Sequence, residues 1–168
     1  MLGPVKGVAA GLVLAVLAVS ALAQQLRPLP PLLRTVSDEV EALSVEEGRA
    51  LSRSAEEIFD RTGVRVIIVI AETTRPEEIA DYTERLGQRW KRERHLVPER
   101  SIFVVLAVQD REFQVMPGKG LEFVDRELKK PEAYAGLAPL FRERRYFDAL
   151  MSVNRRLLDM LLSRKSRM

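Results

Sequence analysis

The sequence predicts one α/β domain, in which a small mixed β-sheet is covered by helices on both faces (an α/β/α sandwich). Two apolar segments rich in β-branched residues, 65–71 and 102–108, are typical of strands buried on both sides. Segments with helical spacing of apolar residues stand before, between and after them, as in a layered α/β fold. None of the 168 residues is cysteine, so a packed core must stabilise the domain without disulfides.

The first 23 residues have the pattern of a secretory signal peptide. Lys6 precedes an uncharged, mostly apolar stretch, and Ala21-Leu22-Ala23 offers the small-x-small pattern that a signal peptidase accepts. We expect cleavage before Gln24 and export of the mature protein, either to the periplasm or out of the cell. The alternative is an uncleaved anchor, because the uncharged stretch continues to Leu26 and approaches the ~20 residues of a membrane span.

Three further segments are predicted from composition. Residues 24–31 contain three prolines, which favour an extended arm, and the domain is expected to occupy residues 32–163. Residues 164–168 form a basic tail, which predicts only weak attraction to anionic lipid. The formal net charge of +3 indicates no particular partner, and the signal peptide contributes one lysine and no acid to it.

Helix and strand signals follow one another from residue 44. Ser44 and Glu47 predict a capping box, and the helix after it carries an apolar face before Gly63 ends it. Residues 65–71 predict a central strand. Thr74 and Glu77 are expected to cap a second amphipathic helix. Its apolar side is predicted to consist of Ile79, Tyr82, Leu86 and Trp90.

Residues 101–117 predict a β-hairpin, whose first strand has no polar face for solvent. We therefore expect the hairpin to form the centre of the fold. The glycines after it end the second strand. Residues 123–130 predict a short helix that Pro131 ends, and residues 132–141 predict another irregular or helical segment around Pro139. A longer amphipathic helix is predicted from Tyr146 to the basic tail.

The hairpin and its exit, Gly118-Lys119-Gly120-Leu121-Glu122, resemble the signature of the TPM domain. The resemblance extends in the same order through Val36-Ser37-Asp38, Thr62-Gly63, Trp90 and Pro139-Leu140-Phe141-Arg142. The chain departs from the family where Glu99-Arg100-Ser101 replaces the usual Asp-Arg-Gly, and where Phe123 replaces a frequent glycine. The resemblance implies the same sandwich fold, and it implies divalent-cation binding or acid phosphatase activity, both attributed to the family.

Carboxylates around this signature are candidate ligands for Ca²⁺ or Mg²⁺, which prefer oxygen donors. The candidate metal ligands are Asp38, Glu99, Glu122 and Asp125, with Glu127 as the alternative to Asp125. They bind one cation only if the fold gathers them at one end of the sheet. Two of them also have a structural explanation, since Glu122 suits the first turn of a helix and Asp38 can cap a turn.

Other chemistry is less well supported by the residues. Gly118-Lys119-Gly120 can present amides to an anion, but the missing third glycine of a dinucleotide fingerprint favours a simple turn. His95 stands alone in a charged run, and no serine lies in a Gly-x-Ser-x-Gly elbow. The arginine groups at 89–94 and 142–145 alternate with acids and lack neighbouring aromatic rows, which favours solvated helix faces over a nucleic-acid surface.

The sequence thus predicts an exported accessory or interaction domain near the membrane, which works with a membrane or envelope protein and binds a divalent cation. The alternative is a metal-assisted acid phosphatase, in which a metal-bound water is the nucleophile. A third possibility is a structural adaptor without a ligand. The mutual positions of the candidate carboxylates are expected to distinguish the first reading from the third.

Overall fold

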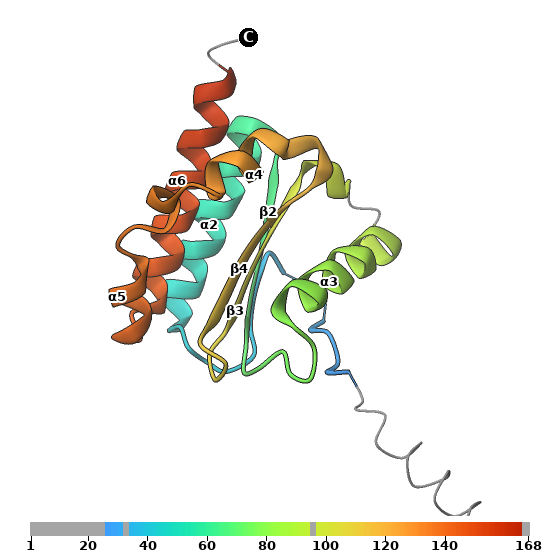
Figure 1. Ribbon diagram of the computed structural model, residues 1–168, viewed down its shortest axis with the longest axis vertical. Helices are drawn as coiled ribbons and strands as arrows, with labels where there is room; N and C mark the ends of the chain where they lie inside the picture. Colours follow the sequence, from blue (N-terminus) through green and yellow to red (C-terminus); the bar gives the residue numbers. More distant parts are fainter. Residues whose placement is uncertain (1–25, 32–33, 95–96, 166–168) are drawn as a thin grey trace, which may run out of the picture.

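The computed structural model describes residues 26–31, 34–94 and 97–165, and a four-stranded sheet lies between helical layers in it (Figure 1). Among these residues, no helix is long and apolar enough to cross a bilayer. The elements in chain order are β1 (Val36–Asp38), α2 (Val45–Thr62), β2 (Arg65–Ala71), α3 (Ile79–Arg94), η1 (Pro98–Arg100), β3 (Ser101–Ala107), β4 (Glu112–Pro117), η2 (Lys119–Leu121), α4 (Glu122–Leu128), η3 (Pro131–Tyr134), α5 (Leu137–Arg142) and α6 (Tyr146–Lys165).

The strand order is β1-β2-β3-β4, with β1, β2 and β3 parallel and β4 antiparallel to β3. All seven residues of β3 are buried, so this strand is internal as predicted. The expectation that the whole hairpin is central is wrong for β4, which forms an edge of the sheet. Glu112 and Gln114 interrupt the apolar pattern of β4, and such a strand is better placed where one side remains partly exposed.

Both faces of the sheet are covered, which confirms the predicted sandwich. Alternate residues of β2 and β3 point to opposite faces. Ile68 and Val104 pack on one face with α2, α4, α5 and α6, and Val69 and Val105 pack on the other with α3. The predicted apolar side of α3 is confirmed, since Tyr82, Leu86 and Trp90 are buried against the sheet.

The two crossovers between parallel strands, β1–α2–β2 and β2–α3–β3, have opposite handedness. The chain steps across the sheet in the same direction from β1 to β2 and from β2 to β3. However, α2 and α3 cover opposite faces, as Figure 1 shows on the two sides of the sheet. One crossover is therefore left-handed, which is uncommon in β-α-β units. The connection after β1 leads to α2 on one face, and the connection after β2 leads to α3 on the other. In open α/β sheets, the carboxyl ends of two neighbouring strands whose connections diverge in this way are a frequent ligand site.

The two main capping predictions have different outcomes. In α2 the Ser44 hydroxyl accepts a hydrogen bond from the Glu47 amide, and the Glu47 carboxylate accepts one from the Ser44 amide, which confirms the capping box. The predicted cap of α3 is wrong, because the helix begins only at Ile79. Pro76 disfavours a helical conformation at Arg75, and the segment before Ile79 is folded by contacts with other loops instead.

Candidate functional site

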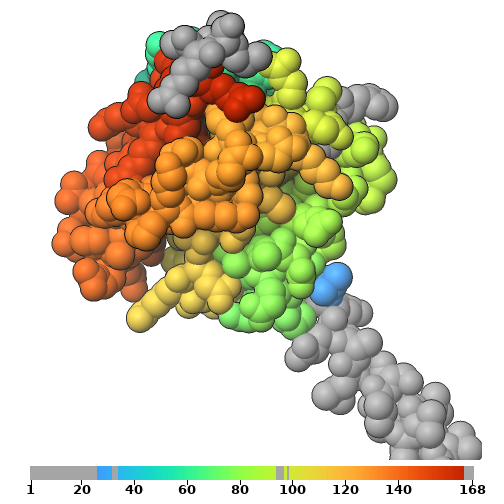
Figure 2. All heavy atoms as spheres, turned by 45° about the horizontal axis from the view of Figure 1, so that its top comes forward, coloured from blue at the N-terminus to red at the C-terminus, as the bar shows by residue number. Residues whose placement is uncertain are grey.

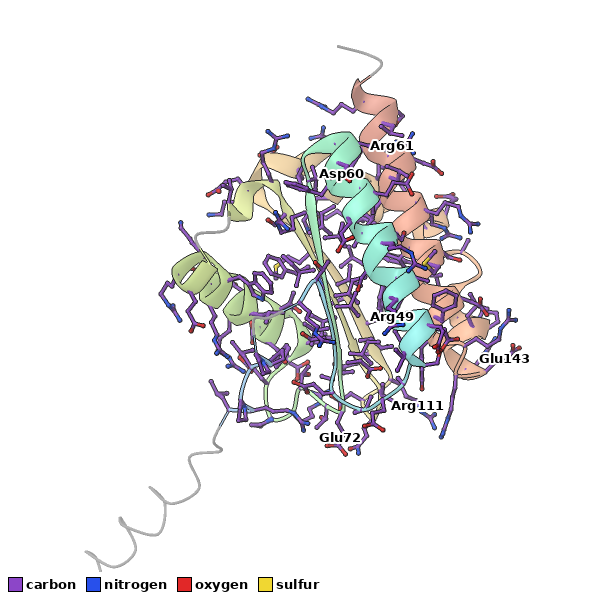
Figure 3. The ribbon with its side chains drawn as sticks, turned by 180° about the vertical axis from the view of Figure 1, so that it is seen from behind. Arg49, Asp60, Arg61, Glu72, Arg111 and Glu143 are labelled. Atoms are coloured by element: carbon purple, nitrogen blue, oxygen red, sulfur yellow. The ribbon has the colours of Figure 1, made fainter. Side chains whose placement is uncertain are left out.

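Chemistry-bearing residues lie at both ends of the sheet. We use "glycine-turn end" for η1, η2 and the start of α4, which lie beside the amino end of β3. We use "hairpin-tip end" for the opposite end, where β1, β2 and β3 finish and residues 108–111 connect β3 to β4. Figure 3 labels residues of both ends, with Arg61 near the first and Arg111 and Glu72 at the second.

At the glycine-turn end, η1 and η2 are in direct contact. A Cβ atom at Gly120 would lie 2.8 Å from the carbonyl oxygen of Glu99, so only glycine fits there. The Gly118 amide donates to the Ser101 carbonyl at 2.8 Å, which closes the turn onto β3. Gly118 and Gly120 therefore allow the chain to turn, which is the interpretation that the sequence favoured over an anion site. This packing brings Glu99 and Glu122 to the same end, and both are exposed without a polar partner among the described residues.

The other candidate ligands are engaged elsewhere. Asp125 pairs with Lys129 at 2.6 Å and Glu127 with Lys130 at 2.7 Å, both on or just after α4. In the part of the chain that the structure describes, no group of three or more histidine or acidic side chains is arranged to hold a metal ion. His95 lies outside the described residues.

Asp38 lies at the hairpin-tip end, away from the other candidates. Its carboxylate accepts hydrogen bonds from the amides of Val40 and Leu43, at 3.2 and 2.9 Å, and so caps a turn. Asp38 is in register with Ile70, which pairs with Leu106. Leu106 is five residues beyond the start of β3, so about 16 Å of strand separates Asp38 from the glycine-turn end.

A network at the hairpin-tip end ties the hairpin to the loop before α3. The Asp110 carboxylate accepts hydrogen bonds from the Thr73 hydroxyl at 2.7 Å and from the Thr74 amide at 2.8 Å. Arg75 bonds to Glu112, and the charges of Glu112 and Glu78 raise the pKa of its guanidinium. Sequence reasoning missed this network, because its partners are separated by more than thirty positions.

The described part of the N-terminal arm packs on the domain. Arg85 donates to the Arg27 carbonyl at 3.0 Å, and Arg89 donates to the Leu29 carbonyl at 3.0 Å. The Leu29 side chain joins the apolar cluster under α3. Sequence reasoning placed Arg89 on a solvated helix face, although its spacing of four residues from Arg85 could have indicated a shared partner.

Arg27 also enters a half-buried charged cluster beside Tyr82. Its guanidinium lies 3.3 Å from the Glu72 carboxylate and 3.8 Å from that of Glu39. Burial raises the pKa of Glu39, although the charge of Arg27 opposes the effect. Burial, with Glu39 nearby, raises the pKa of Tyr82 to about 12. The Tyr82 hydroxyl has no hydrogen-bond partner among the described residues.

A groove of about 420 Å³ opens between the hairpin tip and α5, and we call it the hairpin-tip groove. Its floor is apolar and aromatic, with Phe113 and Phe141 in contact at 5.1 Å between ring centroids. Figure 2 shows the gold hairpin tip projecting beside the orange segment that contains α5. The lining residues are Leu106, Val108, Arg111, Glu112, Phe113, Ala138, Phe141, Arg142, Arg144 and Tyr146.

Comparison with known proteins extends these observations. The profile of the TPM domain matches residues 36–159. No curated protein matches the chain at significant similarity.

Three solved structures resemble the fold. The N-terminal domain of a P. gingivalis protein has a TM-score of 0.65 at 21% identity, and the match covers 76% of this chain and 82% of that one. The N-terminal domain of the cg2496 protein from Corynebacterium glutamicum has a TM-score of 0.62 at 11% identity, with 80% and 86% covered. The BA42 protein from the psychrophilic bacterium Bizionia argentinensis has a TM-score of 0.62 at 16% identity, with 74% and 85% covered.

Proposed function

Because the chain belongs to the TPM domain family, we propose that it is an exported accessory domain that works beside a membrane by binding other molecules. The observation that carries this proposal is the docked arm. Arg85 and Arg89 fasten the backbone of residues 27–30 to α3, so the arm is not a free linker. A free linker would let the domain move away from the segment that precedes it.

The docked arm determines how the domain is placed relative to the segment that precedes the arm. Residues 7–25, just before the arm, are uncharged and mostly apolar, and together with Lys6 they resemble a signal peptide or an anchor. Figure 1 shows the blue arm leaving the domain beside α3 and toward the hairpin-tip end. If the segment anchors the chain, this end of the domain is held near the bilayer, in reach of a membrane or envelope protein.

The experiment that tests export expresses the full chain and the Ala23→Arg variant in a Gram-negative host. We expect the unchanged chain in the periplasm with an N-terminus at Gln24, or on the membrane with the domain open to protease added to spheroplasts. Ala23→Arg blocks the small-x-small pattern and should leave the exported domain bound to the membrane. Recovery of both proteins in the cytosol, protected from protease, would overturn the proposal.

We also propose that Glu99 and Glu122 bind Ca²⁺ or Mg²⁺ at the glycine-turn end, with water completing the coordination shell. The support is that Glu99 and Glu122 reach the same end of the sheet without polar partners among the described residues. Calcium should then raise the melting temperature by mass action, and Glu122→Gln should abolish the rise. Asp38→Asn is the matched control, because Asp38 lies at the other end and should leave the rise intact.

The same proteins distinguish cation binding from the phosphatase alternative. A binding domain shows the calcium-dependent rise without hydrolysing p-nitrophenyl phosphate. Metal-dependent hydrolysis that is lost in both Glu122→Gln and Glu99→Gln would instead establish the enzyme. A chain with neither property retains the role of a binding module without a cation.

A further inference from the structure

We propose that the hairpin-tip groove binds an acidic peptide segment of a partner protein, in which a large apolar side chain is flanked by carboxylates. The proposed function concerns where the domain works and whether it holds a cation at the opposite end of the sheet. The groove is a separate site, and its ligand chemistry can be measured whether or not export and cation binding are correct.

The shape and the lining of the groove suit one or two large apolar side chains. Its volume of about 420 Å³ lies within the range of small ligand sites. Phe113 and Phe141 form the aromatic floor, and Phe113 also contacts Tyr134 edge to face at 6.1 Å between centroids. Aromatic side chains that are already packed on one another form a firm floor for an apolar anchor from a partner.

The rim of the groove carries an excess of positive charge. Arg111, Arg142 and Arg144 line it, and none of their guanidinium groups has a hydrogen-bond or ion-pair partner among the described residues. The one acid of the lining, Glu112, is paired with Arg75. Arginine binds carboxylates through paired, charge-assisted hydrogen bonds. The groove therefore complements a ligand that has an apolar centre and an acidic border.

Two of these arginines also occupy unfavourable backbone conformations. Arg111 and Arg144 each have φ of 57°, and Glu41 is the other non-glycine residue with positive φ in the described ranges. Glycine adopts this left-handed conformation more readily than arginine does. Such residues cluster at binding sites, where the side chain is needed in spite of the strained backbone. Their placement around one groove supports a role for their charge.

The charge pattern also argues against the chain's own N-terminal segment as the occupant. The first 25 residues contain no aspartate or glutamate, so they cannot neutralise the arginines. A partner protein with an acidic segment is the occupant that the groove complements.

The test uses the purified full chain and a fluorescein-labelled hexapeptide, acetyl-Glu-Asp-Leu-Phe-Glu-Asp-amide. We expect a saturable rise in fluorescence anisotropy, which weakens as salt screens the charges. The double variant Arg111→Gly and Arg144→Gly should weaken binding by about tenfold, since exposed ion pairs contribute modestly one by one. Glycine adopts a positive φ without strain at both positions, so this variant should remain folded.

A second variant places a competing charge in the groove. Ala138 is exposed on the first turn of α5, where an acid is compatible with the helix. Ala138→Glu should abolish peptide binding, because the introduced carboxylate would pair with the arginines of the groove and compete with the acids of the peptide. Ala80→Glu is the matched control, since Ala80 is exposed on the first turn of α3 and lies outside the groove.

Three results would overturn the inference. The first is equal binding by the unchanged chain, the double glycine variant and Ala138→Glu. The second is equal binding of a peptide in which lysines replace the four acids, or in which serines replace the apolar pair. The third is concentration-dependent dimerisation that is lost in the double glycine variant and excludes the peptide, which would make a second copy of the chain the occupant.

Discussion

The backbone of Glu99 lies against Gly120, so closely that a Cβ atom on the glycine would be 2.8 Å from the Glu99 carbonyl oxygen. The segment before β3 and the turn after β4 are thereby locked together at the end of the hairpin remote from its tip. Gly120 does not have a positive φ, so close approach rather than backbone conformation requires glycine there.

We expect Gly120→Ala to lower the free energy of unfolding by about 1–3 kcal/mol, because backbone atoms must move to admit the methyl group. Gly48→Ala is the control. Gly48 lies within α2 with open space around its Cα, and alanine there should raise the free energy of unfolding by about 0.5–1 kcal/mol. Urea denaturation of both variants measures the difference, and an equal response would contradict the close contact.

Release of the arm is predicted for Arg89→Ala, which removes the hydrogen bonds to the carbonyls of Leu29 and Pro30. Because the chain has no cysteine, a nitroxide on Leu26→Cys reports the arm alone. Its electron paramagnetic resonance spectrum should show higher mobility after Arg89→Ala. Arg92→Ala, on the exposed side of the same helix, should leave the spectrum unchanged, and identical spectra for all three proteins would refute the docking.

Tyr82 provides a pH-dependent prediction. Its pKa is raised to about 12, so the folded state disfavours the ionised phenol, and stability falls as pH rises from about 10 toward that value. Tyr82→Phe removes this loss together with a buried hydroxyl that has no partner among the described residues. The phenylalanine variant should be equally or more stable at pH 7, and its melting temperature should fall less between pH 9 and 11.

Burial of the central strands is tested by Val104→Asp. Val104 is fully buried between Ile68 of β2 and Val115 of β4. An unpaired charge there costs several kcal/mol, which is comparable to the roughly 5–15 kcal/mol that stabilise a whole domain. Circular dichroism should show an unfolded chain, whereas Arg92→Asp on the exposed side of α3 should stay folded. A native spectrum for Val104→Asp would contradict the burial of Val104 in the centre of the sheet.

Local signals predicted the elements that depend on local structure. The capping box of α2 and the apolar side of α3 are properties of residues within one helical turn or a few turns, and both were predicted. The strand β1 was not predicted, because a segment of three residues is too short to show a periodic pattern of apolar side chains. The start of α3 was misplaced because Asp110, from a distant loop, binds Thr73 and Thr74.

The candidate sites depended on topology, which the sequence did not specify. The sequence left open whether Asp38 and Glu99 lie together, and the parallel register of β1, β2 and β3 places them at opposite ends. The hairpin-tip groove was not predicted, because its arginines belong to two segments about thirty positions apart. Composition had suggested that Arg142 and Arg144 belong to a solvated face, which gave no reason to group them with Arg111.

The agreement between strand order and chain order has a consequence for synthesis. Each strand can pair with the one just before it in the chain, so the sheet can assemble in the order in which the chain emerges. The face of the sheet that α2 covers is completed only by α6, whose Leu150 and Leu157 are fully buried. A nascent chain that stops before Tyr146 therefore exposes an apolar sheet surface, and chaperones would have to shield it until the last helix is made.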